Sequence, residues 1–317
     1  MDWLGAEIDG PLVVIRAIHF AATAMTAGIL IFRTVVAGAN SACAVAAMVR
    51  SQTLRIAWAC LAISATSGMI WLLLVAASMS GLSFEESMNA DVLWAVVNET
   101  QFGLVCEIRL VLAIILAGCL AYDRLLPARG LAVGLSLGQI AALAWTGHAG
   151  STAGEVGVLH LTSDILHLFA AAVWIGGLVS LVLLLSMARN DQTAAGLSFA
   201  REATQRFSTV GVGVVAVILA TGVVNGWILV GSWPALISTG YGRLLMLKIA
   251  LFAVMLLIAA VNRFWLTPRL APPSASGPRL EALRRLARNS MLEIALALVI
   301  FVMVGVLGTL HPAVHAM

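Results

Sequence analysis

Long apolar runs dominate this 317-residue chain and constrain its fold more than any other feature. Hydrophobic residues make up 61% of the sequence and charged residues only 10%, whereas soluble domains carry about 25% charged residues. A helix crosses a bilayer in about 20 mainly apolar residues. The sequence therefore predicts an all-α fold, a polytopic membrane helix bundle with eight transmembrane helices in a single integral membrane domain, residues 1–317. The predicted spans are roughly 11–38, 54–80, 101–122, 129–147, 160–188, 207–231, 242–266 and 289–310.

Basic side chains gather in alternate loops, which orients the predicted bundle in its membrane. Arg33, Arg50 and Arg55 flank the loop after the first predicted span, and the loop before the last span is the most basic of the chain. The loops on the opposite side contain acidic residues, such as Glu85 and Glu86, but neither Lys nor Arg. Cytoplasmic loops carry an excess of Lys and Arg, so the basic loops are predicted to face the cytoplasm. An even number of spans places both termini on the same side of the membrane, and the basic loops make this side the periplasm.

Two histidines lie inside predicted spans, where an ionisable side chain costs about 2.5–3.5 kcal/mol on insertion scales. At 1.5 Å per residue, His19 is roughly 12 Å and His167 roughly 10 Å from the periplasmic ends of their helices. His148 and His160 lie at the periplasmic edges of the fourth and fifth spans. Ionisable groups in such positions tend to face a cavity or a partner, so these four histidines are candidate ligands of a metal or a cofactor.

The stretch HLTSDILH, residues 160–167, places three polar side chains on one face of the fifth span. At about 100° per residue, Asp164 lies about +40° and His167 about −20° from His160. Met246 and Met303, in the last two spans, lie at a depth similar to that of His19 and His167. Imidazole is suited to copper and zinc, and thioether sulfur selects Cu(I). The predicted metal ligands are therefore His148, His160, Asp164, His167, His19, Met246 and Met303.

Each of these residues also has a structural interpretation that involves no ligand. Asp164 is favourable near the start of a helix, His19 can be a core histidine that hydrogen-bonds a neighbour, and methionines often fill cores. Glu107 and Arg16, at similar depth in the third and first spans, are predicted to form a structural ion pair. The four cysteines show no CxxC spacing, which indicates neither a disulfide framework nor a zinc site.

Six short sequence motifs follow one another in the second half of the chain. They are TGHAG (146–150), HLTSDILHLFAAAVWIGGL (160–178), RFSTVG (206–211), TGVVNG (221–226), TGYGRLLMLKIAL (239–251) and VNR (261–263). In this order they resemble the copper resistance protein D family of bacterial inner-membrane proteins, most densely over 145–265. The resemblance implies eight helices, a multi-pass place in the inner membrane, a role in copper resistance and homeostasis, and a small periplasmic copper-binding protein as partner.

We therefore expect an inner-membrane copper-binding permease that moves copper from the periplasm to the cytoplasm. The outer residues would collect Cu(II), and His19, Met246 and Met303 would pass Cu(I) deeper into the bundle. Membrane lipid is the expected surrounding, no GxxxxGK[ST] motif for ATP is present, and nucleic acid is not an expected partner. Substitution of His167 is expected to weaken copper binding more than substitution of His315.

Two other functions fit the same residues. His19 and His167 could be axial ligands of a haem b, with Arg16, Arg243 and Lys248 near its propionates. The chain would then be an electron-transfer protein or an oxidoreductase, whereas the permease is not an enzyme. A third possibility is an assembly factor that delivers copper to a cuproenzyme without transporting it. A Soret band distinguishes the haem protein, and copper uptake into proteoliposomes distinguishes the permease from the assembly factor.

Overall fold

The predicted apolar runs fold into long helices. The computed structural model describes residues 9–38, 43–271 and 276–315, and within these ranges it contains helices and no strand. Eight of the described helical segments are long and apolar enough to cross a membrane. The predicted fold class, an all-α membrane bundle with eight spans, is therefore confirmed.

The spans run Gly10–Val36, Ala44–Ser80, Gln101–Ala121, Leu126–Ala144, Gly154–Asp191, Ala194–Val230, Gly240–Leu270 and Gly277–Leu307. Their helices are α1 (Gly10–Ile31), α2 (Ala44–Ser80), α5 (Gln101–Ala121), α6 (Leu126–Ala144), α8 (Gly154–Asp191), α9 (Ala194–Val230), α11 (Gly240–Val261) and α12 (Ser276–Leu307). α1 continues as the π-helix η1 (Phe32–Val36), and α11 continues as the π-helix η2 (Asn262–Leu266) and the 3-10 helix η3 (Thr267–Leu270). The shorter elements are α3 (Phe84–Ser87), α4 (Ala90–Glu99), α7 (His148–Ser151), α10 (Trp233–Ser238) and η4 (Ala313–His315).

Several helices begin well before the apolar run that identifies them. α2, α9 and α12 start at residues 44, 194 and 276, before the predicted spans that begin at 54, 207 and 289. At 1.5 Å per residue the 37 residues of α9 extend about 55 Å, against about 30 Å for the hydrocarbon core of a bilayer. Hydropathy detects only the part of a helix that lies in lipid, so the polar first turns of these helices escape prediction.

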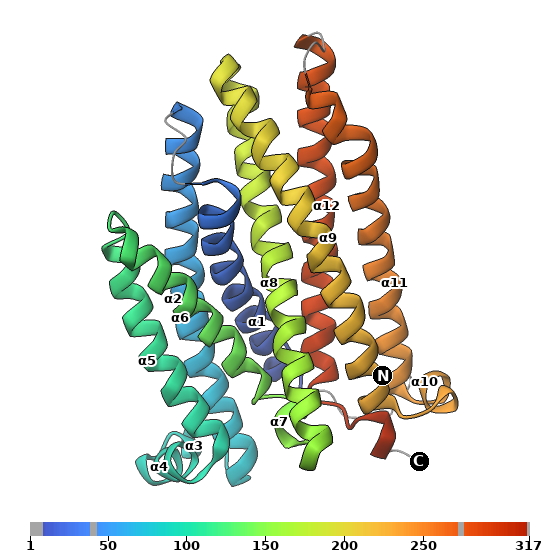
Figure 1. Ribbon diagram of the computed structural model, residues 1–317. Coiled ribbons are helices and arrows are strands. Elements are labelled where there is room, and N and C mark those ends of the chain that lie inside the picture. The colour runs from blue at the N-terminus through green and yellow to red at the C-terminus, as the bar shows by residue number, and fades with distance from the viewer. Residues whose placement is uncertain (1–8, 39–42, 272–275, 316–317) are drawn as a thin grey trace.

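α1 and α8 pack against each other at the centre of the bundle. α2, α5 and α6 lie on one side of this pair, and α9, α11 and α12 lie on the other (Figure 1). α1 also contacts α2, α6 and α12, so most of its surface is covered by protein. Polar side chains on these two helices can therefore find partners in neighbouring helices rather than in lipid.

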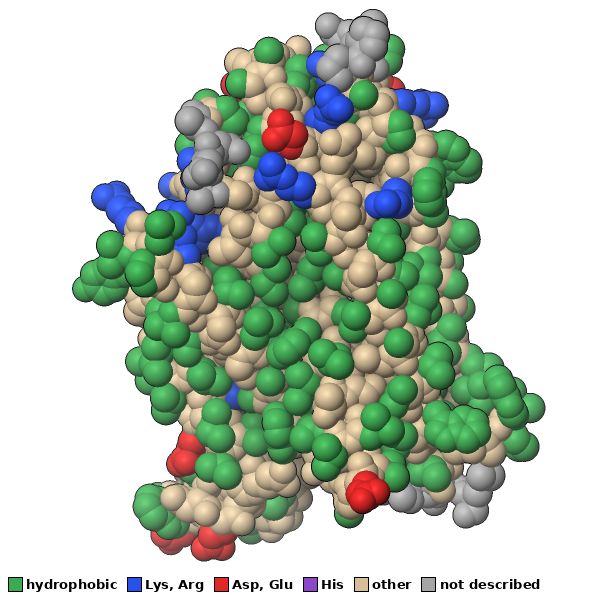
Figure 2. Space-filling view, in the orientation of Figure 1, with side chains coloured by type: hydrophobic (Ala, Val, Ile, Leu, Met, Phe, Trp, Pro, Cys, Tyr) green, Lys and Arg blue, Asp and Glu red, His purple; other side chains and the backbone are tan. Residues whose placement is uncertain are grey.

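The two ends of the bundle differ in their connections and in their charge. The short helices α3, α4, α7 and α10 all lie at one end (Figure 1). Lys and Arg side chains gather at the opposite end, where a few acidic side chains also lie, whereas the charged side chains visible at the end of the short helices are acidic (Figure 2). We call these the basic end and the acidic end. The separation follows the alternation of charge between successive loops in the sequence.

Two glycines allow α1 and α8 to approach each other closely. A Cβ atom on Gly176 would lie 2.6 Å from Cα of Gly28 and 2.5 Å from the amide nitrogen of Ile29. A Cβ atom on Gly28 would overlap the carbonyl oxygen of Ala172. Small residues at helix interfaces let backbones pack directly in membranes, where no hydrophobic force drives helices together. The central helix pair therefore depends on the absence of side chains at these two positions.

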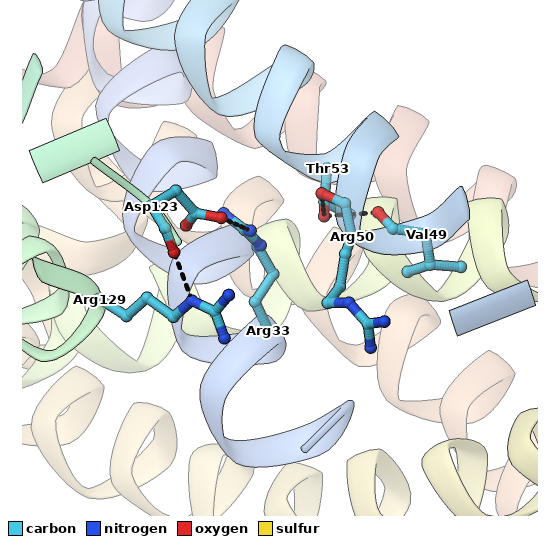
Figure 3. Close-up of polar contacts among 6 residues, drawn as sticks. All are labelled: Arg33, Val49, Arg50, Thr53, Asp123 and Arg129. Atoms are coloured by element: carbon cyan, nitrogen blue, oxygen red, sulfur yellow. Dashed lines mark hydrogen bonds and ion pairs between the residues drawn. The ribbon is translucent and has the colours of Figure 1, made fainter. Parts of the chain in front are cut away.

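An ion pair at the basic end joins the first span to the loop between α5 and α6 (Figure 3). Nη2 of Arg33 donates to Oδ2 of Asp123 at 2.7 Å, and Nε of Arg129 donates to the backbone oxygen of Asp123 at 2.6 Å. Only 8% of the Arg33 side chain and 16% of the Asp123 side chain are exposed. Low exposure limits the screening of this ion pair by solvent and salt.

We expect Gly176→Ala to destabilise the bundle. The added methyl group meets backbone atoms of α1, which cannot rotate away, so overpacking should cost about 1–3 kcal/mol or more. Gly134→Ala on α6 is the matched control, because no atom lies within 4 Å of the Cβ position there. Thermal unfolding in detergent, followed by near-UV circular dichroism, compares the two variants. Equal melting temperatures would contradict the close contact between α1 and α8.

Candidate functional site

His160 on α8 is held by a threonine that also binds the backbone of His148. Oγ1 of Thr152 donates to the backbone oxygen of His148 at 2.9 Å and lies 2.8 Å from Nδ1 of His160. A hydroxyl group has one hydrogen, so Nδ1–H of His160 donates to Thr152. The lone pair of the neutral His160 ring is then on Nε2. His148 donates from Nε2 to the backbone oxygen of Leu307 at 3.1 Å, which leaves the lone pair of its neutral ring on Nδ1.

His167, two turns further along α8, has a similar environment. Its Nδ1 lies 2.9 Å from Oγ1 of Thr221 on α9. Thr221 donates its hydroxyl hydrogen to the backbone oxygen of Val217 at 2.6 Å. Nδ1–H of His167 therefore donates to Thr221, and the lone pair of the neutral ring is again on Nε2. The ring packs beside Gly222, whose Cβ position would lie 3.7 Å from Cε1.

His19 on α1 repeats the arrangement against a serine of α2. Its Nδ1 lies 3.0 Å from Oγ of Ser67, and Ser67 donates to the backbone oxygen of Ile63 at 2.6 Å. The His19 ring also meets the indole ring of Trp71 edge to face, with ring centroids 5.4 Å apart. His19 is 3% exposed, so it is a histidine of the protein interior.

α8 begins at Gly154, so His160 lies inside a span together with His167 and His19. These three histidines share one hydrogen-bonding scheme. In each case Nδ1–H of the histidine donates to the hydroxyl group of a threonine or serine. Thr221 and Ser67 donate their own hydroxyl hydrogen to a backbone oxygen one turn earlier in the same helix. Thr152 donates its hydroxyl hydrogen to the backbone oxygen of His148. This scheme selects one tautomer and fixes the orientation of the ring. Metal-binding histidines use the nitrogen opposite to such a hydrogen bond. The Nε2 atoms of His160, His167 and His19 are therefore the nitrogens with which these residues would bind a metal.

Asp164 lies between the two histidines of α8 and close to a lysine of α11. Its Oδ1 accepts a hydrogen bond from Nδ2 of Asn225 at 3.3 Å. Lys248 is near enough to interact electrostatically with both Asp164 and His167, although it forms no ion pair at contact distance among the described residues. Asp164 and Lys248 therefore belong to one polar cluster in the bundle interior.

The structure separates several of the predicted ligands. Within the described residues no three side chains of His, Cys, Asp or Glu lie close enough to share one metal ion. Met303 is buried among Leu307, Leu310 and Tyr241 at the acidic end, and Met246 is half-buried on α11. The sequence places His160, Asp164 and His167 on one face, but His160 bonds to Thr152 whereas the other two bond to α9. Copper ligation by these residues stays a prediction.

The predicted ion pair between Glu107 and Arg16 is wrong. Among the described residues the two are not paired: Glu107 is exposed on α5, and Arg16 is 8% exposed. The guanidinium carbon of Arg16 lies 5.0 Å from the centroid of the Trp71 ring, and the group packs against Gly308, which directly follows α12. Similar depth in two spans is not sufficient for contact, because depth does not determine the direction in which each side chain points.

Sequence reasoning missed a polar network beside His19. Nη2 of Arg109 on α5 donates to Oγ1 of Thr23 at 3.3 Å, and Gln139 on α6 donates to the backbone oxygen of Arg109 at 2.7 Å. A cavity of about 10 Å³, enough for about one water molecule, adjoins this network. Its polar lining comes from Thr23, Thr26, Ser64, Ser136 and Gln139. The sequence signal for this network was the presence of single polar residues within apolar runs.

Sequence reasoning also missed Glu293, a carboxyl group buried in α12. The predicted ligands all lie in the outer parts of the spans, whereas Glu293 lies four residues from the start of the predicted span 289–310, on the basic side. The signal was present, because a glutamate within a run as apolar as 289–310 is unusual.

We expect Asp164→Asn and Lys248→Met to be energetically coupled. Each single substitution leaves one charge in the interior without its counterpart, so the double variant should lose less stability than the two single losses together, by about 0.5–3 kcal/mol. Thermal unfolding of the four proteins in detergent measures this difference. Asp164→Asn combined with Gly134→Ala is the control and should be additive. Additive losses for Asp164 and Lys248 would show that the two charges do not interact.

Comparison with known proteins identifies the family. The model of the copper resistance protein D family matches residues 201–307, and the model of the copper resistance protein D-like N-terminal domain matches residues 7–158. Copper resistance protein D of Pseudomonas syringae pv. tomato is 31% identical over 253 residues, which are 78% of this chain and 80% of that protein. Inner membrane protein YebZ of Escherichia coli (strain K12) is 31% identical over 251 residues, 79% of this chain and 81% of the other.

A third relative matches a shorter part of the chain. Copper transport protein CutJ of Bacillus subtilis (strain 168) is 37% identical over 125 residues, which are 39% of this chain and 22% of that protein. No solved structure matches. The two family models together cover most of the chain, and two relatives align over more than three quarters of it. This multi-pass membrane protein belongs to the copper resistance protein D family.

Proposed function

We propose that this protein is a copper permease of the bacterial inner membrane that moves copper ions from the periplasm to the cytoplasm and catalyses no reaction. The positive-inside rule assigns the basic end to the cytoplasm, so both termini and the acidic end are periplasmic. Family membership supports copper as the cargo, and one relative is named a copper transport protein.

The observation that carries this proposal is the common scheme of the three histidines inside the spans. Hydroxyl groups hold His160, His167 and His19 in the tautomer whose Nε2 can bind a metal. The first two follow one another inward along α8, and His19 lies on α1, which packs against α8. Separate positions with one histidine each suit a passing ion, which must be released at every step.

The proposed ligands supply two kinds of donor group. His148, His160 and Asp164 supply imidazole and carboxylate groups at the acidic end, and this combination suits Cu(II). Met246 and Met303 supply thioether sulfur, which selects Cu(I). We propose that copper enters at the acidic end from a small periplasmic copper-binding protein and continues past His167 and His19 into the bundle.

A haem b between His19 and His167 finds less support in the geometry. The His19 ring bonds to Ser67 and packs on Trp71, both on α2, whereas the His167 ring bonds to Thr221 on α9. α2 and α9 lie on opposite sides of the α1–α8 pair (Figure 1). Two axial ligands must point into one space from opposite faces of a haem, and these two rings are held toward different helices.

We expect His167→Ala to weaken copper binding at least about tenfold, because it removes a ligand nitrogen inside the bundle. Thr221→Val should weaken binding about 10-fold to 100-fold by releasing the orientation of the same ring. His311→Ala is the control, since His311 is exposed beyond the last span. Titration of the purified protein with Cu(I) and with Cu(II) measures the affinities. An unchanged affinity in His167→Ala would remove this residue from the path.

Copper uptake into proteoliposomes tests transport directly. We expect vesicles that contain the protein to accumulate copper faster than empty vesicles, and vesicles that contain His167→Ala to fall well below wild type. Copper that binds but does not enter would indicate a delivery or assembly factor instead. The visible spectrum of the same preparation provides the check on haem, because a stoichiometric Soret band would replace the permease by a haem protein.

A further inference from the structure

Glu293 is a buried carboxyl group that the proposed copper path does not use. It lies on α12 and is 1% exposed. Its Oε1 accepts a hydrogen bond from Nδ2 of Asn262 at 2.9 Å, and its Oε2 accepts one from Nε1 of Trp174 at 3.3 Å. Oδ1 of Asn262 accepts in turn from Nδ2 of Asn289 at 2.8 Å, which turns the Asn262 amide nitrogen toward the carboxyl group.

No cation compensates Glu293 within the described part of the chain. The ion pairs there join Arg33 to Asp123, Arg206 to Glu202 and Arg285 to Glu281. α1, α8, α11, η2 and η3 pack against α12. None of them presents a described titratable or charged side chain at hydrogen-bonding or ion-pairing distance from Glu293. Arg263 follows Asn262 in η2 but donates to the backbone oxygen and Oγ of Ser208, both at 2.7 Å.

An uncompensated carboxylate in a membrane interior must bind a cation or a proton, because the isolated charge is costly there. Among the described residues, the groups that hydrogen-bond to Glu293 are an amide N–H and an indole N–H, which are neutral and present hydrogens rather than lone pairs. Copper prefers imidazole and sulfur ligands, so the site is poorly suited to the cargo ion.

Glu293 lies on the same helical seam as the histidines of α8. His160, His167 and Trp174 follow one another at seven-residue intervals along α8, and Lys248, Met255 and Asn262 do so along α11. Each interval advances about 10 Å and returns to nearly the same face of the helix. The Trp174 ring packs edge to face on Phe252, with centroids 5.9 Å apart, in an apolar cluster that includes Met255 and Ala297. The seam therefore has a polar cluster around His167, an apolar seal, and then Glu293.

We propose that Glu293 is a proton-binding site that couples the movement of copper to the movement of a proton, an inference that rests on the proposed transport function. In the closed seam the carboxyl group carries its proton. When the seam opens toward the basic end, the O–H bond breaks, the electron pair stays on the carboxylate, and the proton passes to water. After the seam closes, water at the acidic end supplies the next proton to the carboxylate, which restores the starting state. No group is oxidised or reduced.

The first experiment measures the protonation of Glu293 without copper. The copper-free protein in liposomes is titrated with pH while the infrared band of protonated carboxyl groups is recorded. We expect a pH-dependent component of this band that is present in wild type and in the control Glu107→Gln, and absent in Glu293→Gln. Glu293→Asp serves if the glutamine variant does not fold, because it should keep the band at a shifted frequency. A band that is the same in wild type and in all Glu293 variants would overturn the proposal.

The second experiment measures coupling. Proteoliposomes with a pH-sensitive dye inside receive copper(II) chloride with ascorbate, and copper uptake and internal pH are followed together. We expect a copper-dependent pH change in wild type and Glu107→Gln that falls at least tenfold in Glu293→Gln, while copper titration still shows binding. An unchanged pH signal in Glu293→Gln would overturn the coupling role. An infrared band without any copper uptake would instead reject the permease and leave the proton-binding site in place.

Discussion

The direct backbone contact between α1 and α8 positions the polar interior of the bundle. Gly28 and Gly176 let the two helices meet without side chains between them, and the other spans then pack around this pair. α1 carries His19 and Arg16, and α8 carries His160, Asp164 and His167. Since both helices are covered by protein on most sides, these groups face other helices. A wider separation would expose them to lipid, where their partners could not reach them.

A single device orients the histidines of this interior. In a membrane, serine and threonine donate readily to a carbonyl of their own helix, which uses their only hydrogen. Thr221 and Ser67 do this, and Thr152 donates to the backbone of His148, so each hydroxyl can only accept from a histidine. The same local rule therefore sets the tautomer of three rings on two helices. The hydrogen bond from a serine or threonine hydroxyl group to a backbone oxygen therefore determines which nitrogen of each histidine would bind a metal.

The sequence predicted features that depend on a single helix, but it did not predict contacts between side chains of different helices. The spans and the burial of His19 were predictable, because hydropathy and depth are properties of a single helix. The pair of Glu107 with Arg16 was not, since it needs the rotation of two helices about their axes. Arg16 instead found the aromatic face of Trp71. Glu293 was visible as a charge in an apolar run, but its amide and indole partners come from η2 and α8.

The sequence alone determined the membrane setting, the number of spans and the grouping of basic residues at one end, because each depends on composition within single segments. It also determined that histidines lie inside the spans. Tertiary structure decided which side chains meet: His160 with Thr152, His167 with Thr221, and Glu293 with Asn262 and Trp174. The reason is geometric. The depth of a residue follows from a rise of 1.5 Å per residue, but its neighbours depend on how whole helices rotate and approach, which packing at contacts such as Gly28 and Gly176 sets.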